Sequence, residues 1–305
     1  MVQFLLRRLL VALLVSVTVL TFAFALTRLS GDLAISIAGP NATANDIEVV
    51  RKAYGLDQPL ITQFFSWIGR AMVGDFGQSY FYRERVSTLI FSRLPITLTL
   101  GLVGLGIAVS VALPLGVISA LREGRPIDRV ISLVALVGQA MPSFWLALVL
   151  MITLGLNLGW LPISGTGTWQ HFVMPGIVLS FSAIPALLRL TRSGMIDAMA
   201  ADYIRTARAK GLSRMSIVLK HAARNAAMPV VSIAAVQLGF MLGGSIVIET
   251  VFALHGVGFL AWESISKNDF PTVQAVVLLL AVIYTLLTLG ADLLNALLDP
   301  RLRAQ

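Results

Sequence analysis

Long apolar runs separated by short polar stretches dominate this chain of 305 residues. A helix that crosses ~30 Å of hydrocarbon needs about 20 mostly apolar residues. Six runs approach that length, so the pattern predicts six transmembrane helices. The first run follows Arg7 and Arg8 and lacks a cleavage site of small residues, so we expect it to be retained as a span. The expected spans cover residues 9–26, 94–121, 131–156, 172–188, 229–248 and 270–291.

Three prolines lie inside these runs, at Pro114, Pro142 and Pro185. An interior proline breaks a helix in water, but neighbouring groups in a membrane protein can satisfy the carbonyl that it leaves free. Each proline therefore predicts either a packing feature or a bend that shapes a pathway.

The segment of about 65 residues between the first two spans has helical patterns of its own. We expect Asn45 to cap a helix that begins near Asp46 and ends at Gly55, and Pro59 to open a second, amphipathic helix. Two interpretations stay open. The segment is either a helical cap on the membrane domain or a docking surface for an external partner.

Composition supports a membrane protein. Hydrophobic residues make up 57% of the chain and charged residues 12%, against about 25% charged in a soluble domain, and the mean hydropathy is +0.86. An ordinary soluble enzyme and a disordered chain are both excluded. The net charge of +8 does not indicate nucleic acid, because the basic residues lie in short clusters between apolar runs.

These basic clusters predict the orientation. With the N-terminus in the cytoplasm, 15 of the 23 Lys and Arg residues lie inside, and most of the others fall in the long segment, which counts little. Both termini are therefore expected in the cytoplasm. The expected units are a cytoplasmic start and first span at 1–29, an extracytoplasmic segment at 30–93, and a five-helix core at 94–305.

The sequence offers no catalytic or metal site. It contains no phosphate-binding loop, no metalloprotease motif and no cysteine, and its three histidines lack metal-ligand spacing. Arg28, Glu249 and Asp292 lie near predicted span ends, whereas ion-coupled carriers place such residues deep in their spans. We therefore expect the energy for any transport to come from a partner.

The loop at 189–228 is longer than a passive connection needs. Gly211 is expected to end one helix, Ser213 to cap the next, and Pro229 to follow its end. The apolar positions of the first helix are Ile196, Met199, Tyr203, Ile204 and Ala207. The resulting knuckle, residues 202–213, has a basic rim. It predicts either a surface that rests on anionic lipid or a docking element for a cytoplasmic partner.

Residues 202–213, followed by 221–229, closely resemble the EAA loop of ABC-importer permeases of the dipeptide/oligopeptide/nickel class. The chain departs from the general pattern at Arg205-Thr206-Ala207, where Glu-Ala-Ala is usual, at His255-Gly256, where Pro-Gly is common, and at Gly31-Asp32-Leu33, which lacks a proline. Further motifs that resemble this family lie at 56–60, 74–79, 141–145, 249–252, 269–271 and 298–301.

The resemblance implies an all-α type I ABC-importer permease in the bacterial inner membrane. It implies a heterodimer with a second homologous permease, two ATPase subunits that bind ATP and Mg, and an extracytoplasmic substrate-binding protein, with no cofactor in this chain. The expected cargo is a short peptide, although relatives carry glutathione-like peptides, nickel chelates and sugar conjugates.

The resemblance also implies that an ATPase-coupling loop lies within about residues 193–228. In it Arg205, Arg208 and Lys210 would donate to the ATPase, and Ala207 would allow a close approach. The implied coupling residues are Asp202, Tyr203, Arg205, Thr206, Ala207, Arg208, Lys210, Gly211, Leu212 and Ser213.

Two other classes were weighed. A stand-alone secondary transporter or channel does not account for the missing relay charges or for the knuckle. A membrane scaffold does not need six spans with prolines and glycines in them.

Overall fold

The computed structural model describes residues 2–29, 32–39 and 41–298. Gly31, Arg301, Arg303 and the end of the motif at 298–301 lie outside the described residues. The α-helices are α1 (Val2–Leu29), α2 (Leu33–Ala38), α3 (Ala44–Ala53), α4 (Leu60–Met72), α5 (Val86–Leu121), α6 (Pro126–Ala140), α7 (Ser143–Leu150), α8 (Val173–Ala200), α9 (Asp202–Ala209), α10 (Arg214–Ser216), α11 (Ala223–Val251), α12 (Val257–Ser266) and α13 (Phe270–Leu298). Two π-helical stretches, η1 (Met151–Asn157) and η3 (Ile217–Ala222), and one 3₁₀ turn, η2 (Trp169–Phe172), complete them.

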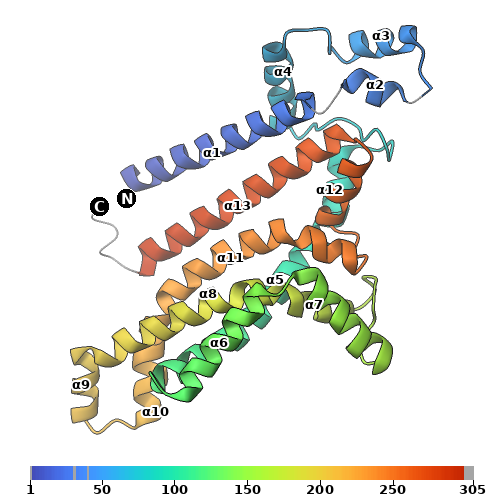
Figure 1. The fold of residues 1–305 in the computed structure, drawn as a ribbon. Coiled ribbons are helices and arrows are strands. Elements are labelled where there is room, and N and C mark those ends of the chain that lie inside the picture. The colour runs from blue at the N-terminus through green and yellow to red at the C-terminus, as the bar shows by residue number, and fades with distance from the viewer. Residues whose placement is uncertain (1, 30–31, 40, 299–305) are drawn as a thin grey trace.

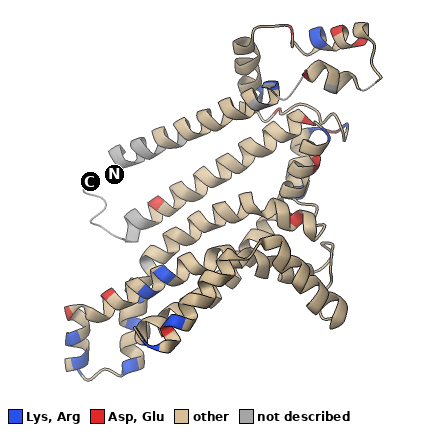
Figure 2. Cartoon of the chain, viewed as in Figure 1, with Lys and Arg blue, Asp and Glu red and all other residues tan. Residues whose placement is uncertain are grey.

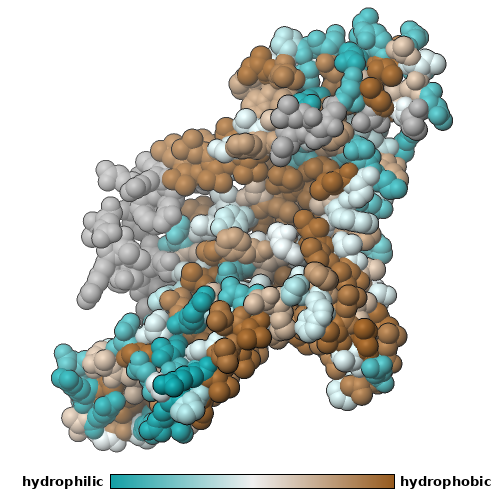
Figure 3. Space-filling view, viewed as in Figure 1, coloured by the Kyte–Doolittle hydropathy of each residue, from teal (hydrophilic) through white to brown (hydrophobic). Residues whose placement is uncertain are grey.

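The long helices form a row in which α5 packs on α8, α8 on α11, α11 on α13 and α13 on α1 (Figure 1). Helices α2–α4 lie at one end of this bundle of long helices, and α9 and α10 lie at the opposite end. Hydrophobic surface covers the middle of the molecule, and hydrophilic side chains gather at its two ends (Figure 3). The arrangement is that of an apolar bundle with two polar ends.

Four helical segments in the described part of the chain are long and apolar enough to cross a membrane. These are 86–121, 169–200, 229–251 and 270–294, and they correspond to the predicted second, fourth, fifth and sixth spans. The bent pair α6 and α7–η1 passes the same test only when its two halves are taken together as one span, which gives a fifth. The first predicted span lies in α1, whose described apolar stretch, Leu13–Ala25, is shorter. The total of six spans stays a prediction.

The predicted third span at 131–156 is bent at Pro142, which is one of the two outcomes that the proline predicts. Its two halves, Pro126–Ala140 and Ser143–Asn157, meet at an angle of 99°. The break falls at Met141, which has an extended backbone (φ −71°, ψ 131°), followed by Pro142. Proline has no N–H to donate and clashes with a helical residue before it, so the helix stops there and restarts.

Two other helix boundaries differ from expectation. Helix α5 begins at Val86, ahead of the expected start at residue 94. Pro229 was expected to follow the end of a helix, but it lies inside α11. Its ring removes the hydrogen bond to the carbonyl of Asn225. Both residues are on an exposed side of the helix, where that carbonyl can find another donor.

In the 30–93 segment, the expected cap at Asn45 is wrong by two residues. Thr43 is the N-cap of α3: its hydroxyl accepts from the amide of Asp46 at 3.3 Å, and the Asp46 carboxylate accepts from the amide of Thr43 at 3.0 Å. Reciprocal bonds of this kind satisfy two donors that the first turn leaves free. The expected helix end at Gly55 is confirmed. Gly55 has φ +63°, and the amide of Leu56 donates to Arg51 O at 2.8 Å.

The segment is tied together and rests on the bundle. Asp32 caps α2 and forms an ion pair with Arg51 of α3 at 2.6 Å, and the hydrogen bond from this guanidinium holds the pKa of Asp32 below its usual value. Helix α4 rests on α1 through Phe24, whose ring lies 5.3 Å from that of Phe64 and 6.3 Å from that of Trp67. The segment therefore packs as a cap on the first long helix.

Helices α5 and α8 approach each other closely at Gly116. A Cβ at Gly116 would lie 2.7 Å from Thr191 Cβ and 3.0 Å from the backbone oxygen of Leu188. Small residues at such points let two helix backbones come together, which is a main source of helix association in membranes.

Gly116→Val should separate α5 from α8 and lower the free energy of unfolding by about 1–3 kcal/mol, because the backbone atoms that it meets cannot move aside. The matched control is Gly106→Val in the same helix, where an added Cβ meets nothing within 4 Å. Unfolding in mixed detergent micelles measures both variants. Equal stability of the two would contradict the close contact.

Candidate functional site

The turn of the knuckle forms as its sequence predicts. At its turn, Gly211 has φ +74°, its amide donates to Arg208 O at 2.9 Å, and the amide of Leu212 donates to Ala207 O at 3.3 Å. This pair of bonds closes α9 and requires a left-handed residue at Gly211. Ser213 then accepts from the amide of Ser216 at 3.3 Å and caps α10. Both predicted signals are confirmed.

The start of the knuckle differs from expectation. The apolar positions from Ile196 to Ala207 were expected on one helix, but Ala201 has an extended backbone (φ −71°, ψ 152°) and separates α8 from α9. Ile196 and Met199 therefore belong to the end of α8. Helix α9 is a separate element of eight residues that turns away from the long helix.

One side of the knuckle is packed into the rest of the protein. Ile204 is fully buried and Ala207 is 6% exposed. They belong to a cluster that also contains Met195 of α8, Ile217 of η3 and, at its edge, Val117 of α5. The expectation that Ala207 allows a close approach by a partner is wrong, because its methyl group is covered by this chain. Through this cluster the knuckle packs together with residues of three long helices, α5, α8 and α11.

The opposite side of the knuckle is exposed. Tyr203 and Leu212 of the knuckle and Met215 of the adjoining α10 are 40%, 40% and 68% exposed. Lys and Arg residues gather around α9 and α10 (Figure 2). The exposed residues of the predicted coupling set are Asp202, Tyr203, Arg205, Thr206, Arg208, Lys210, Gly211, Leu212 and Ser213.

A buried ion pair next to the knuckle was not predicted. Asp128, in the first turn of α6, accepts two hydrogen bonds of 2.8 Å from Nε and Nη2 of Arg192 in α8. The hydroxyl of Ser119, near the end of α5, donates to the same carboxylate, and so does the amide of Gly124 at 2.9 Å. This pair ties three helices together. Two opposite charges near predicted span ends were the only sequence signal for it.

At the other end of the bundle, Glu249 is fully buried near the end of α11. Its carboxylate accepts from Thr97 Oγ1 of α5 at 2.7 Å, from Ser245 Oγ at 3.0 Å and from the amide of Phe259 at 2.8 Å. Phe259 is in the first turn of α12, so Glu249 caps a helix that the sequence analysis did not predict.

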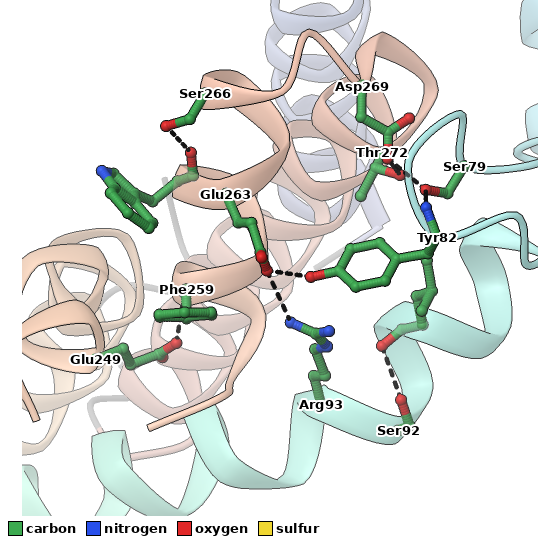
Figure 4. Close-up of polar contacts among 12 residues, drawn as sticks. Ser79, Tyr82, Ser92, Arg93, Glu249, Phe259, Glu263, Ser266, Asp269 and Thr272 are labelled. Atoms are coloured by element: carbon green, nitrogen blue, oxygen red, sulfur yellow. Dashed lines mark hydrogen bonds and ion pairs between the residues drawn. The ribbon is translucent and has the colours of Figure 1, made fainter. Parts of the chain in front are cut away.

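Two more acids fasten α12 and the start of α13, as Figure 4 shows. Glu263 of α12 accepts from the hydroxyl of Tyr82 and lies 4.0 Å from Arg93 of α5. Burial, with this hydrogen bond, raises the pKa of the Tyr82 phenol. Asp269 accepts from Thr272 Oγ1 at 2.7 Å and from the hydroxyl of Ser79. These acids join the 30–93 segment to the membrane core.

A cavity of about 750 Å³ opens between α6, α8 and α11. Ser132 of α6, Ser193 and Arg189 of α8 and Ile233 of α11 are among the residues that line it. In the part of the chain that the structure describes, no three His, Asp or Glu residues are grouped to hold a metal ion.

Two parts of the sequence match known families of membrane transport proteins. Residues 112–304 match the binding-protein-dependent transport system inner membrane component, and residues 1–101 match the N-terminal part of that membrane component. The chain belongs to this family. It is the permease component of a binding-protein-dependent ABC importer in the inner membrane, and is not itself an enzyme. Such an importer works with ATPase and substrate-binding partners. A stand-alone transporter and a scaffold are thereby excluded.

Relatives cover the whole chain. The glutathione transport system permease protein GsiC of Escherichia coli strain K12 is 41% identical, and that of Salmonella typhi 42%, each over 305 residues and 99% of both chains. Among solved structures, an inward-facing MetNI methionine ABC transporter has a TM-score of 0.57 at 20% identity, over 69% of this chain and 96% of the other. It confirms the permease fold.

Asp128→Ala should lower the free energy of unfolding by about 1–3 kcal/mol, because Arg192, whose side chain is 28% exposed, loses the carboxylate that accepts two of its hydrogen bonds and keeps only Glu123 at 3.8 Å. The control is Asp202→Ala, which removes an ion pair with Arg205 whose side chains are 93% and 80% exposed. That change should leave stability within experimental error. Unfolding in micelles measures both; an equally small effect would show that the buried pair does not hold the helices.

Proposed function

We propose that this permease forms half of a translocation pathway in a heterodimer with a second homologous permease, and that its knuckle receives the motion of the ATPase subunits. In this proposal ATP and Mg are bound by those subunits. The observation that carries it is the two-sided knuckle, which is exposed on one side and packed into three long helices on the other.

The packed side provides the mechanical route. A push on α9 reaches Ile204 and Ala207, which are in contact with buried residues of α8 and η3. Close-packed clusters transmit displacement because they have low compressibility. The Asp128–Arg192 pair joins α6 to the same part of α8, so the bent helix pair would move with the knuckle.

The orientation in the membrane follows from the elements that lie at the same end of the bundle. Helix α1 begins and α13 finishes at the end of the bundle where α9 lies (Figure 1). The basic residues gathered around α9 and α10 favour the cytoplasm by the positive-inside rule. We infer that both termini and the knuckle are cytoplasmic, and that α2–α4 are outside, near the substrate-binding protein.

The cavity between α6, α8 and α11 supports a half pathway. It is open on one side, and the neighbouring face of α6 exposes Val130, Leu133, Val134 and Val137. Apolar helix faces of this kind are buried against lipid or other helices. A second permease would close the cavity into a channel with hydroxyl groups and one exposed guanidinium, Arg189, along its wall.

We propose a short peptide of the glutathione class as cargo. The support is the likeness to GsiC over the whole chain and a cavity wall that mixes hydroxyls, aliphatic groups and a positive charge. Substrate-binding proteins deliver the cargo, so uptake of glutathione by the reconstituted importer with its binding protein tests the cargo itself.

Gly211→Leu should abolish binding-protein-stimulated ATP hydrolysis while the complex still assembles. An added Cβ at Gly211 meets nothing within 4 Å of this chain, so the internal cost is the left-handed backbone, roughly 1–2 kcal/mol. Gly159→Leu is the matched control, with φ +63° and equally open space far from the knuckle. ATPase activity of the reconstituted complex is the measurement. Unimpaired coupling in Gly211→Leu would leave the knuckle as a surface that rests on lipid.

Ser132→Cys should place a reactive thiol in the pathway, since Ser132 is exposed in the cavity and the subunit has no cysteine of its own. Reaction with a charged methanethiosulfonate reagent, followed by washing, should reduce uptake several-fold. Ser110→Cys, exposed on α5 outside the cavity, is the control. Equal inhibition of the two variants, or of neither, would contradict the half pathway.

A further inference from the structure

A second cavity, of about 210 Å³, lies where the 30–93 segment meets the membrane core. Its walls come from the end of α1, from α4, from the loop before α5 and from the start of α13. Three of the motifs noted in the sequence, at 56–60, 74–79 and 269–271, contribute to the lining. The motifs are far apart in the chain, and neither the coupling nor the pathway accounts for their meeting here.

Two buried polar atoms at this cavity have no hydrogen-bond partner. Nε of Arg28 is a donor, and Oε1 of Gln63 is an acceptor. The amide nitrogen of Gln63 is held by the carbonyls of Leu56 at 3.2 Å and Gln58 at 2.7 Å, which fixes the direction of its side chain. Native proteins leave few buried polar atoms unpaired, so this wall of the cavity is incompletely satisfied by the chain itself.

The charges at the cavity indicate the chemistry of a molecule that would fit it. Within the described residues, neither Arg28 nor Arg70 forms an ion pair, and both line the cavity. The guanidinium of Arg28 lies 5.0 Å from the ring centre of Phe24, which covers one of its faces. A partly buried guanidinium without an acid is costly, and a carboxylate is its best-matched partner.

The remaining wall restricts the occupant further. Asp75 is the one acid among the lining residues, and it disfavours a second negative charge while it can accept from an ammonium group. At roughly 30 Å³ per water the cavity holds about seven water volumes, which is enough room for a small amino acid.

We propose that this cavity binds a free α-amino acid of small size, with its carboxylate on Arg28 and its ammonium group toward Asp75. The bound molecule would join the 30–93 segment to the first turn of α13, because Phe270 and Gln274 form the opposite wall. This site is separate from the pathway cavity at α6, α8 and α11, and the proposal does not depend on the cargo.

The test measures binding of radiolabelled L-alanine to the complete permease and ATPase complex in nanodiscs, without the binding protein. Wild type should bind it saturably, and unlabelled alanine should compete where alaninamide, which lacks the carboxylate, does not. Absence of saturable binding, or equal competition by alaninamide, would overturn the proposal and leave the cavity to solvent.

Variants locate the site. Arg28→Met should weaken binding at least tenfold, and Arg28→Lys should restore part of it. Ser66→Leu, which adds bulk to the cavity wall, should block binding without removing a charge. Lys52→Met, an exposed cation outside the cavity, should bind alanine as wild type does. Unchanged binding in Arg28→Met and in Ser66→Leu would place the alanine elsewhere and overturn the assignment. Uptake by wild type is assayed separately, so failure of the transport proposal is distinguishable.

Discussion

The close packing of α5 against α8 is the contact on which the other features depend. Gly104, Gly116 and Gly176 allow it, because a Cβ at any of them would lie 2.7–3.2 Å from an atom of the other helix. At one end both helices contribute to the knuckle cluster, and Ser119 of α5 and Arg192 of α8 both donate to Asp128 of α6. At the other end α5 supplies Thr97 to the buried carboxylate of Glu249.

The two ends of the bundle are built differently, and the difference matches their proposed tasks. At the α12 end, Glu249, Glu263 and Asp269 each accept hydrogen bonds from another element, and these buried networks fix the position of a short helix. At the knuckle end, most charges are exposed basic side chains. One end is fastened by buried acids, and the other exposes hydrogen-bond donors on its surface.

Both cavities lie where elements from distant parts of the chain meet. The larger is open on one side and has an exposed guanidinium, Arg189, in its wall. The smaller is more enclosed and leaves Nε of Arg28 and Oε1 of Gln63 unpaired. These properties fit a solute that passes in the first case and one that stays in the second.

Local signals in the sequence determined much of the protein. Long apolar runs specified the long helices, because a backbone in hydrocarbon must satisfy its own hydrogen bonds. Gly211, Ser213 and Gly55 fixed helix ends, because capping acts within a few residues of the chain. The motif at 202–213, together with the other motifs in matching order along the chain, indicated the family.

Tertiary structure alone decided which faces these helices bury. Ala207 turns inward, Asp128 meets Arg192 across 64 positions, and α12 is held by Glu249. The chain bends sharply at Pro142, whereas α11 continues through Pro229. This difference also depends on neighbouring groups that supply or replace hydrogen bonds. In a soluble protein, alternation of polar and apolar residues marks the buried face. Here lipid and protein interior are equally apolar, so the sequence marks a helix without marking its partner.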